Sequence, residues 1–378
     1  MSESFDVIVV GLGAMGSAAS YHLARRGLRV IGVDAFAAGH TFGSSHGETR
    51  IIRMAYFEHP NYVPLLRRAY ALWRQLANAS GADLLRITGG IFIGPPDGDL
   101  VAGSLRSARA HGLSHTLLDA AEIRRLYPVF APGDDDAAVY EDAAGVLFPE
   151  RCIAAHLELA AQHGATLLHA QPATSVEALP GEVRVRTPTG SYSARQVVVT
   201  AGAWVSKLLP DIPVAAERIP LYWFSPRAQL EQFELGRFPI CIWGAADLGD
   251  FYLVPHVAIP GVKVGKHHSG EVVDPATVSR TVSAADEAPL RAFLERCIPS
   301  LAGPVADSRV CLYENSPDLH FLIDFHPSLP NVIVAAGFSG HGFKFASVIG
   351  ELLADLATTG HTTPDADFLR LTRLAALR

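Results

Sequence analysis

The sequence has 378 residues, more than one ordinary domain of roughly 100 to 200 residues usually contains, so we expect two domains. Hydrophobic residues make up 49% and charged residues 18%, a composition that excludes a disordered or fibrous chain. The net charge of -7 and the lack of any Lys/Arg-rich run exclude nucleic acid and anionic membranes as expected partners.

The N-terminal residues and the cysteines favour a cytoplasmic protein. The start, MSESFD, lacks the positive charge of a signal peptide, and no apolar stretch reaches the roughly 18 residues that a membrane helix needs. The cysteines lie far apart and form no CxxC pair, so neither a disulfide framework nor a metal site is expected. They are Cys152, Cys241, Cys297 and Cys311.

The N-terminal segment carries the pattern of a dinucleotide-binding unit. A strand, a glycine turn, a helix and a second strand are predicted in succession, at residues 5–10, 11–16, 17–26 and 28–33. In this pattern Gly11 permits the turn, Gly13 lets the backbone approach a pyrophosphate, and Gly16 lets the helix pack on the strand. Asp34 can accept hydrogen bonds from an adenosine ribose. A glycine-rich turn without a ligand is the alternative.

Further helices and strands are predicted along the chain. Apolar residues recur at helical spacing over residues 62–79, and helices are also predicted over 151–164 and 343–356. The predicted strands lie at residues 86–95, 196–200, 261–267, 308–313 and 331–336. Strands lead into glycine turns near residues 11, 201 and 337, which indicates that distant segments assemble into one nucleotide-binding domain.

The predicted fold class is therefore α/β (α+β), with a Rossmann-like FAD-binding domain assembled from discontinuous segments and a β-sheet-rich substrate domain. FAD is favoured over NAD because an NAD enzyme usually completes its cofactor site within one contiguous half of the fold. The FAD-binding domain is predicted to comprise residues 1–85, 149–212 and 318–378. The substrate domain is predicted to comprise residues 86–148 and 213–317.

Lys263 is singled out by the scarcity of lysine. The chain has 31 basic residues, and the lysines among them are Lys207, Lys263, Lys266 and Lys344. A lysine kept in such a chain suggests a need for a compact, titratable ammonium. In a strand, Lys263 and His267 share a face and can point into one cavity. The alternative is a solvated edge strand.

Two further pairs can bring functional groups together. Cys311 and Tyr313 share a face of the predicted strand at residues 308–313, although a buried cysteine is most often a small hydrophobe. Arg50 and Arg53 are three residues apart, which places both on one side if the segment is helical. They could instead pair with surface acids.

Five sequence blocks, in the same order along nearly the whole chain, resemble the monomeric sarcosine oxidase and N-methyltryptophan oxidase family of FAD-dependent amine oxidases. The blocks are GLGAMG with Asp34, SSHGETRIIRMAY (44–56), VKVGKH (262–267), CLYENSPD (311–318) and GFSGHGFKF (337–345).

The resemblance implies a role for each matching residue. Cys311 would bond covalently to the 8α-methyl group of FAD, Lys263 would promote oxygen reduction beside the flavin ring, and Arg50 would lie over the flavin face. Arg53 and Lys344 would hold the substrate carboxylate, for which arginine can offer two parallel hydrogen bonds.

The resemblance also supplies the remaining site residues. Tyr252 and His267 would line the substrate cavity, and His46 and Tyr313 would lie near the flavin. Catalytic roles would thus fall to Lys263, Arg50, His267, Tyr313 and His46. The implied cofactor contacts are Gly11, Gly13, Met15, Gly16, Asp34, Ser44, Gly337, Gly340, Gly342, Phe343 and Lys344.

Three features depart from the family pattern. Ser45 stands where relatives usually carry a second histidine, and Glu48 replaces the usual aspartate. Residues 240–250 match poorly, although this segment should help to form the wall of the substrate cavity. Substrate size is therefore the feature that the resemblance defines least.

The resulting prediction is a monomeric enzyme that uses O2 to oxidise sarcosine to glycine and formaldehyde, with release of hydrogen peroxide. Oxidation of N-methyl-L-tryptophan or of another secondary amino acid is the alternative. An FAD-dependent amine dehydrogenase with a non-oxygen acceptor is a more distant alternative. The last alternative is a non-catalytic FAD-binding subunit. The cations at positions 50, 53, 263 and 344 disfavour it.

Overall fold

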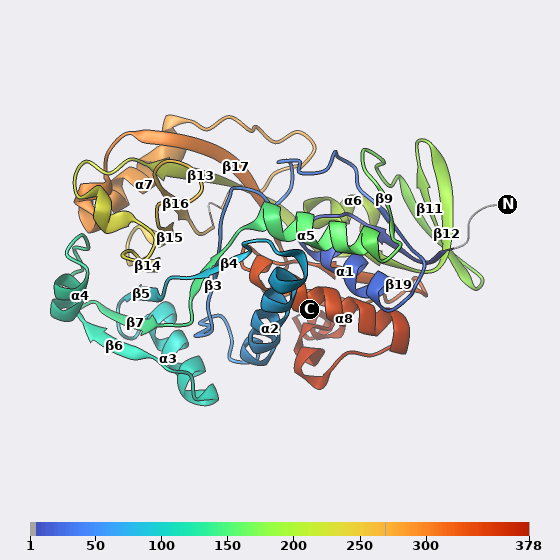
Figure 1. Cartoon of the computed structure of the whole chain (residues 1–378), viewed down its shortest axis with the longest axis horizontal. Helices are drawn as coiled ribbons and strands as arrows, with labels where there is room; N and C mark the ends of the chain where they lie inside the picture. The colour runs from blue at the N-terminus through green and yellow to red at the C-terminus, as the bar shows by residue number, and fades with distance from the viewer. Residues whose placement is uncertain (1–4, 269, 378) are drawn as a thin grey trace.

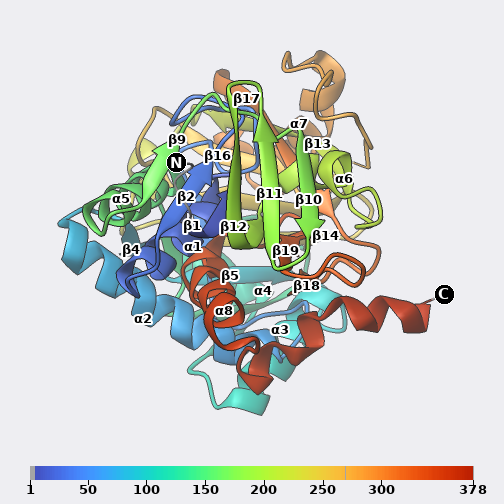
Figure 2. The same ribbon diagram turned by 90° about the vertical axis from the view of Figure 1, so that its right-hand side faces the viewer.

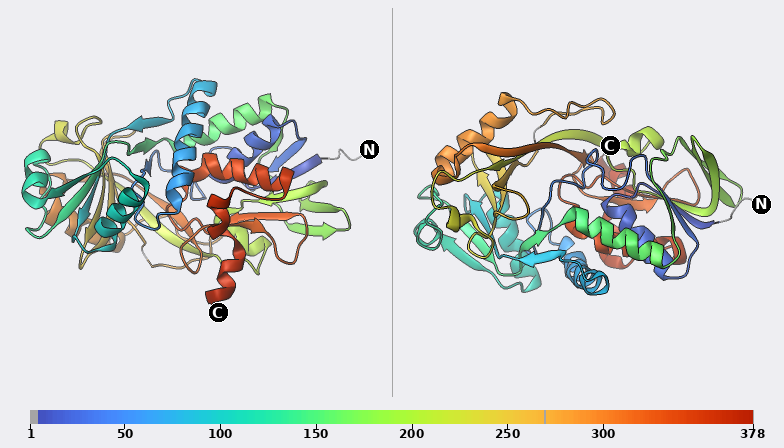
Figure 3. Two further views of the ribbon diagram at one scale, coloured as in Figure 1. Left: turned by 90° about the horizontal axis from the view of Figure 1, so that it is seen from below. Right: turned by 45° about the horizontal axis from the view of Figure 1, so that its top comes forward.

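The described part of the chain forms three β-sheets that are flanked by helices (Figure 1). The computed structural model describes residues 5–268 and 270–377. Residues 1–4, for which the sequence predicts no signal peptide, lie outside the described residues. The described part contains two sheets of eight strands and one of three. Figure 3 shows the two large sheets toward opposite ends of the long axis. The predicted fold class is confirmed.

The first sheet joins segments from distant parts of the chain. Its order is β10-β11-β12-β1-β2-β9, with β19 beside β12 and β18 beside β19. Strand β1 pairs in parallel with both β2 and β12, as a Rossmann-like unit requires (Figure 2). The strands are β1 (Phe5–Val10), β2 (Val30–Val33), β9 (Thr166–Leu168), β10 (Ser175–Leu179), β11 (Glu182–Thr187), β12 (Gly190–Val199), β18 (Leu322–Phe325) and β19 (Val332–Ala336).

Both faces of this sheet are buried. In β1, Val7 and Val9 face a layer of helices, whereas Ile8 and Val10 pack on the opposite side. Because the strand is apolar on both faces, it is stable only in the interior of the domain. The helices of the layer are α1 (Ala14–Arg25), α2 (Tyr62–Ser80), α5 (Pro149–Gln162) and α8 (Ala346–Thr359).

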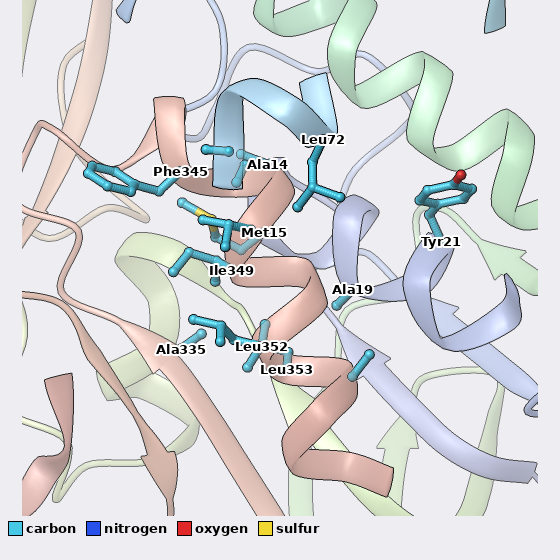
Figure 4. Close-up of a cluster of buried hydrophobic side chains, with 14 of the residues drawn as sticks. Ala14, Met15, Ala19, Tyr21, Leu72, Ala335, Phe345, Ile349, Leu352 and Leu353 are labelled. Carbon is cyan, nitrogen blue, oxygen red and sulfur yellow. The ribbon is translucent and has the colours of Figure 1, made fainter. Parts of the chain in front are cut away.

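The position of α1 is fixed by its packing against α8. Figure 4 shows Met15 at the start of α1 close to Ile349 of α8, within one cluster of buried hydrophobic side chains. Gly350 allows the two helices to touch, because a Cβ atom there would lie 2.5 Å from backbone atoms of Ala18. The N-terminal end of α1 is thereby held at the end of β1.

The second sheet is largely antiparallel, with the order β17-β13-β16-β15-β14-β5-β7-β6. Helices α4 and α7 pack on one face and α3 packs on the other. The strands are β5 (Gly90–Gly94), β6 (Thr116–Asp119), β7 (Ala137–Glu141), β13 (Ala215–Phe224), β14 (Ile240–Ala245), β15 (Gly249–Val254), β16 (Val262–Lys266) and β17 (Val305–Asn315). The helices are α3 (Asp99–His111), α4 (Ala120–Leu126) and α7 (Ala284–Cys297).

The remaining elements are short. The third sheet consists of β3 (Arg50–Ile52), β8 (Gly145–Leu147) and β4 (Leu85–Ile87). One short α-helix, α6 (Val205–Leu208), and several 3₁₀ turns complete the described chain. Across the described residues, we find no helix that is both long enough and apolar enough to span a bilayer.

The structure corrects three local predictions. The helix predicted over 17–26 begins at Ala14, because Gly13 is already its N-cap. The helix predicted over 343–356 starts with a 3₁₀ turn, Phe343–Phe345, before α8. The segment with Arg50 and Arg53 is not helical, since β3 pairs there with β8.

The two large sheets draw on separate stretches of the chain. Strands of the first come from residues 5–33, 166–199 and 322–336, and strands of the second from residues 90–141 and 215–315. The domain boundaries derived from the sequence stay a prediction.

Candidate active site

Two adjoining cavities are lined by residues from both large sheets and their loops. The large cavity has a volume of about 360 Å³ and the small cavity a volume of about 90 Å³. They adjoin because four residues line both of them: Arg50, Tyr313, Gly340 and Phe343.

The glycine turn after β1 forms one wall of the large cavity. Gly11 has a φ of +92°, and a Cβ atom there would lie 2.5 Å from the carbonyl oxygen of Thr200. At Gly16 a Cβ atom would collide with the carbonyl oxygen of Gly11. These close approaches hold the N-terminal end of α1 against the cavity, where its backbone N–H groups favour an anion.

Asp34 lies at the end of β2 in the same wall. Its carboxylate accepts hydrogen bonds from the backbone N–H groups of Leu12 at 2.6 Å and Phe36 at 2.9 Å. The residue is 7% exposed and lines the large cavity, so its remaining lone pairs can accept from a ligand.

The polar atoms of the large cavity fit FAD. The hydroxyl of Ser44 and Nδ1 of His169 are buried and have no hydrogen-bond partner among the described residues, although both side chains line the cavity. Buried polar groups are rarely left unsatisfied, so a polar ligand is expected to bind them. The phosphates, riboses and rings of a dinucleotide can form hydrogen bonds with these groups. They can also bind the N-terminus of α1 and Asp34.

Four cationic side chains line the small cavity: Arg50, Arg53, Lys263 and Lys344. Lys263 is 2% exposed, and its Nζ donates to the carbonyl oxygens of Gly47 at 2.8 Å and Thr49 at 2.9 Å. Burial, with the charge of Arg50, holds the pKa of Lys263 well below its usual value. The edge-strand alternative for Lys263 is wrong.

Arg53 is paired with an acid inside the small cavity. Its Nη2 lies 2.6 Å from both carboxylate oxygens of Glu58, and its guanidinium stacks 4.2 Å from the ring centroid of Tyr56. Burial would raise the pKa of Glu58, but the charges of Arg53, His341 and Lys344 lower it to about 2. The ion pair thus holds the guanidinium of Arg53 in place at the wall of the small cavity.

Lys344 lies next to this ion pair. Its Nζ donates to the carbonyl oxygen of His341 at 2.6 Å, and it is 6% exposed. Burial, followed by the charge of Arg53, lowers the pKa of Lys344 to about 7. The lysine therefore gains or loses its charge near neutral pH.

Cys311 and Arg50 meet at the boundary between the cavities. Nη2 of Arg50 lies 3.5 Å from Sγ of Cys311, and its guanidinium also donates to the carbonyl oxygens of Ser44 and Thr49. Cys311 is 1% exposed and lines the small cavity.

His267 and Tyr313 form a hydrogen-bonded pair in the small cavity, with Nδ1 of His267 3.2 Å from the phenol oxygen. Burial raises the pKa of Tyr313 far above its usual value, so the phenol keeps its proton. Burial also lowers the pKa of His267 to about 3, so the imidazole is neutral. Tyr252 lines the same cavity.

The structure thus gathers most of the predicted site residues around the two cavities. The predicted residues in the large-cavity wall are Gly11, Gly13, Met15, Asp34, Ser44, Arg50, Tyr313, Gly340, Gly342 and Phe343. Those in the small-cavity wall are Arg50, Arg53, Tyr252, Lys263, His267, Cys311, Tyr313, Gly340, Phe343 and Lys344.

Three predicted residues lie in neither cavity wall. Gly16 and Gly337 instead allow close packing of the backbone, since a Cβ atom on either would collide or crowd its neighbours. His46 is 2% exposed, and neither ring nitrogen has a partner among the described residues. Burial and the neighbouring cations lower the pKa of His46 to about 3.

The residues that depart from the family pattern make the following contacts. Ser45 lines the large cavity and accepts a hydrogen bond from the Ala14 N–H at 3.3 Å, while Glu48 forms an ion pair with Arg309 at 3.0 Å. Ile242 and Asp250, from the poorly matching segment, line the small cavity.

Three acids of the site were missed by the sequence reasoning. Glu58 binds Arg53, Glu150 accepts from the N–H groups of Gly47 and Glu48, and Glu314 lines the large cavity. Glu314 belongs to the CLYENSPD block, but its position in the site depends on contacts between distant segments.

Comparisons with known proteins identify the family of this chain. The family described as "FAD dependent oxidoreductase" matches residues 6–356. Monomeric sarcosine oxidase of Streptomyces avermitilis is 45% identical over 381 residues, covering 100% of this chain and 99% of the relative. N-methyl-L-tryptophan oxidase of Yersinia pestis is 37% identical over 371 residues, covering 98% of this chain and 99% of the relative.

Solved structures share the fold at lower identity. NikD, an unusual amino acid oxidase, superimposes with a TM-score of 0.85 at 22% identity, covering 98% of each chain. L-proline dehydrogenase from P. horikoshii superimposes with a TM-score of 0.85 at 23% identity, covering 100% of each chain. Taken with the full-length relatives, these matches show that the chain belongs to the FAD dependent oxidoreductases, in the family of monomeric sarcosine oxidases and N-methyl-L-tryptophan oxidases.

Proposed function

We propose that this enzyme oxidises N-methyl amino acids and that sarcosine is its preferred substrate. Sarcosine, O2 and water would give glycine, formaldehyde and hydrogen peroxide, which balances atoms and electrons. The observation that carries the proposal is the small cavity itself, a narrow space with four basic side chains beside the large cavity. FAD, when bound in the large cavity, accepts the electrons of the amine and passes them to oxygen.

The small cavity suits a short substrate. Its volume of about 90 Å³ is far below the roughly 300 to 1,000 Å³ of pockets for drug-sized ligands. Apolar side chains of Phe57, Leu100 and Ile242 close its walls. An indole side chain would have to displace some of these walls, so the volume supports sarcosine over N-methyltryptophan.

Arg53 and Lys344 provide the site for the substrate carboxylate. The carboxylate would accept hydrogen bonds from Arg53 and Lys344, beside the ion pair that Arg53 forms with Glu58. The cations around it would lower the pKa of the substrate ammonium, which favours the neutral amine needed for oxidation. The pair of His267 and Tyr313 lies in the same cavity and can orient the amine by hydrogen bonding.

A substrate comparison tests this proposal. We expect kcat/KM, measured by hydrogen peroxide release, to be at least about tenfold higher for sarcosine than for N-methyl-L-tryptophan. In Ile242→Ala, which widens the wall of the small cavity, the ratio should fall toward one. A higher kcat/KM for N-methyl-L-tryptophan in the unmodified enzyme would contradict the preference, and activity only on primary amino acids would contradict the reaction class.

The second part of the proposal is a covalent bond between Sγ of Cys311 and the 8α carbon of FAD. Its formation would remove one hydrogen from the thiol and one from the 8α-methyl group, the two electrons would reduce the flavin, and O2 would reoxidise it with release of hydrogen peroxide. Its support is the position of Sγ at the boundary of the cavities, 3.5 Å from the guanidinium of Arg50. Acid precipitation should leave the yellow colour in the protein pellet, and in Cys311→Ala the colour should move to the supernatant. Cys241→Ala, a change at another buried cysteine that lines neither cavity, is the matched control. Colour retained in the Cys311→Ala pellet would refute the bond.

Oxygen as the acceptor and a monomeric state complete the proposal. Lys263 supports the use of oxygen because a buried amino group in the small cavity can stabilise the negative charge that oxygen reduction creates. An amine dehydrogenase would instead reduce a dye rapidly under air with little oxygen consumption. The monomeric state is supported by the name of the Streptomyces avermitilis relative and is checked by light scattering.

A further inference from the structure

Glu314 is a buried acid in the wall of the large cavity that the proposed reaction does not use. The residue is 6% exposed, and its Oε2 is buried without a hydrogen-bond partner among the described residues. It lies in β17 directly after Tyr313, and its register partner on β13 is Ala216. Because Glu314 is one of the residues that line the cavity, a ligand bound there could supply the missing hydrogen bond.

Among the residues that the structure describes, no cation compensates the Glu314 carboxyl. Burial raises its pKa to about 8, opposed only by the backbone N–H groups of Phe338 and Gly337. At neutral pH the group is therefore a carboxylic acid, which can donate one hydrogen bond as well as accept others.

In the described part of the chain, no charged side chain on the elements packed on β17 contributes to the pKa shift of this carboxyl. On β13, Glu217 is the register partner of Tyr313 and so faces the other side of the sheet, toward His268 and Asn315. The 3₁₀ turn Gly202–Trp204 carries no ionisable side chain, and the nearby Lys207 forms an ion pair with Asp274.

Other titratable groups border the large cavity or the turn after β19. In this turn, the Ser339 N–H donates a hydrogen bond to the backbone oxygen of Glu314. The side chain of His341 forms hydrogen bonds with Tyr56 and with the backbone oxygen of Leu319. The remaining titratable side chains in the cavity wall are Asp34, His40, Arg50, Glu150, His169 and Tyr313.

We propose that Glu314 contacts FAD as a neutral carboxylic acid and donates a hydrogen bond to an oxygen of the cofactor. The inference rests on the proposed binding of FAD in the large cavity. FAD carries two phosphates, so an ionised Glu314 would repel it and could no longer donate. Glutamine has the same shape and keeps a donor and an acceptor at every pH, which makes Glu314→Gln the matched variant.

The contact makes FAD affinity depend on pH. Binding requires the proton on Glu314, and the free protein loses this proton as the pH rises through about 8. The Kd for FAD should therefore rise about tenfold between pH 7 and pH 9, because a required proton with this pKa weakens binding tenfold per pH unit above it.

The test measures FAD binding without turnover. In the Cys311→Ala background, in which FAD is expected to exchange, apoprotein is titrated with FAD at pH 7 and pH 9 by flavin fluorescence. The tenfold rise in Kd is expected there, whereas Cys311→Ala with Glu314→Gln should give a Kd that changes less than about twofold. Both proteins share every other titratable group, so the difference isolates residue 314.

A second variant and a folding control complete the experiment. Glu314→Leu, which has no donor, should bind FAD at least about tenfold more weakly at pH 7. Thermal unfolding of each apoprotein at both pH values verifies that it is folded. The same pH dependence with glutamate and glutamine at position 314 would overturn the role of Glu314 while leaving FAD binding intact. Folded Cys311→Ala protein that binds no FAD at any pH would overturn the cofactor site itself.

Discussion

Replacing Lys263 by methionine is expected to slow the reoxidation of the reduced flavin by O2 about a thousandfold, with a much smaller effect on its anaerobic reduction by substrate. The first electron transfer to O2 creates superoxide, and a unit charge about 4 Å away at an effective dielectric near 20 stabilises it by about 4 kcal/mol. Stopped-flow absorbance in separate anaerobic and aerobic experiments measures the two half-reactions.

The pKa of Lys263 adds a pH dependence to this expectation. Because burial and Arg50 hold that pKa well below its usual value, Lys263 loses its charge at a lower pH than an exposed lysine. Reoxidation should therefore slow as the pH rises through this pKa. In Lys263→Met the reoxidation rate should show no such fall.

Lys266→Met is the matched control for Lys263→Met. Lys266 lies on the same strand, β16, but lines neither cavity, so both half-reactions should keep their rates. If Lys263→Met slowed flavin reduction and flavin reoxidation by the same factor, the residue would support the structure of the site rather than oxygen reduction.

Replacing Lys344 by methionine is expected to raise the Kd for carboxylate ligands about ten- to hundredfold at pH 6. A hydrogen bond to a charged group contributes about 1.5 to 3 kcal/mol, which corresponds to this range. Acetate, which has a carboxylate but no amine, is the probe, and its binding is followed by the absorbance of the bound flavin. Lys344 is a better target than Arg53, whose removal would leave Glu58 buried without its partner.

The contribution of Lys344 to carboxylate binding should decrease as the pH rises. Its pKa is lowered to about 7, so the free enzyme carries the Lys344 charge below this pH and loses it above. The Kd of the unmodified enzyme for acetate should therefore increase from pH 6 to pH 8.5 and approach that of Lys344→Met. Parallel pH profiles for the two proteins would contradict a direct contact between Lys344 and the carboxylate.

The fold could be predicted from the sequence where local patterns determine it. The glycine turn at Gly11 and the strands around it were found because an apolar strand, a positive-φ glycine and a helix start leave a local signature. Arg50 and Arg53 show the limit. Their spacing is compatible with a helix, but pairing with β8, about 100 residues away, makes the segment a strand.

The site could be predicted in part because a family resemblance placed distant blocks together. Cys311, Lys263 and Lys344 lie in such blocks, and the structure brings all three into the wall of the small cavity. Glu58 and Glu314 could not be assigned in this way. Their roles depend on which side chains come within reach after folding and on how deeply they are buried, and neither property has a local signature.

The pairing of β12 with β1 and β19 has a consequence for biosynthesis. Strand β1 leaves the ribosome early, but its neighbour β12 begins at Gly190, and β19 and the Gly340 turn follow more than a hundred residues later. The exposed edge of β1 must remain unpaired during this interval, which is when a nascent chain is prone to aggregate. Phe343 is the last residue in the wall of the large cavity, so FAD bound there would stabilise only chains that have been made at least to this residue.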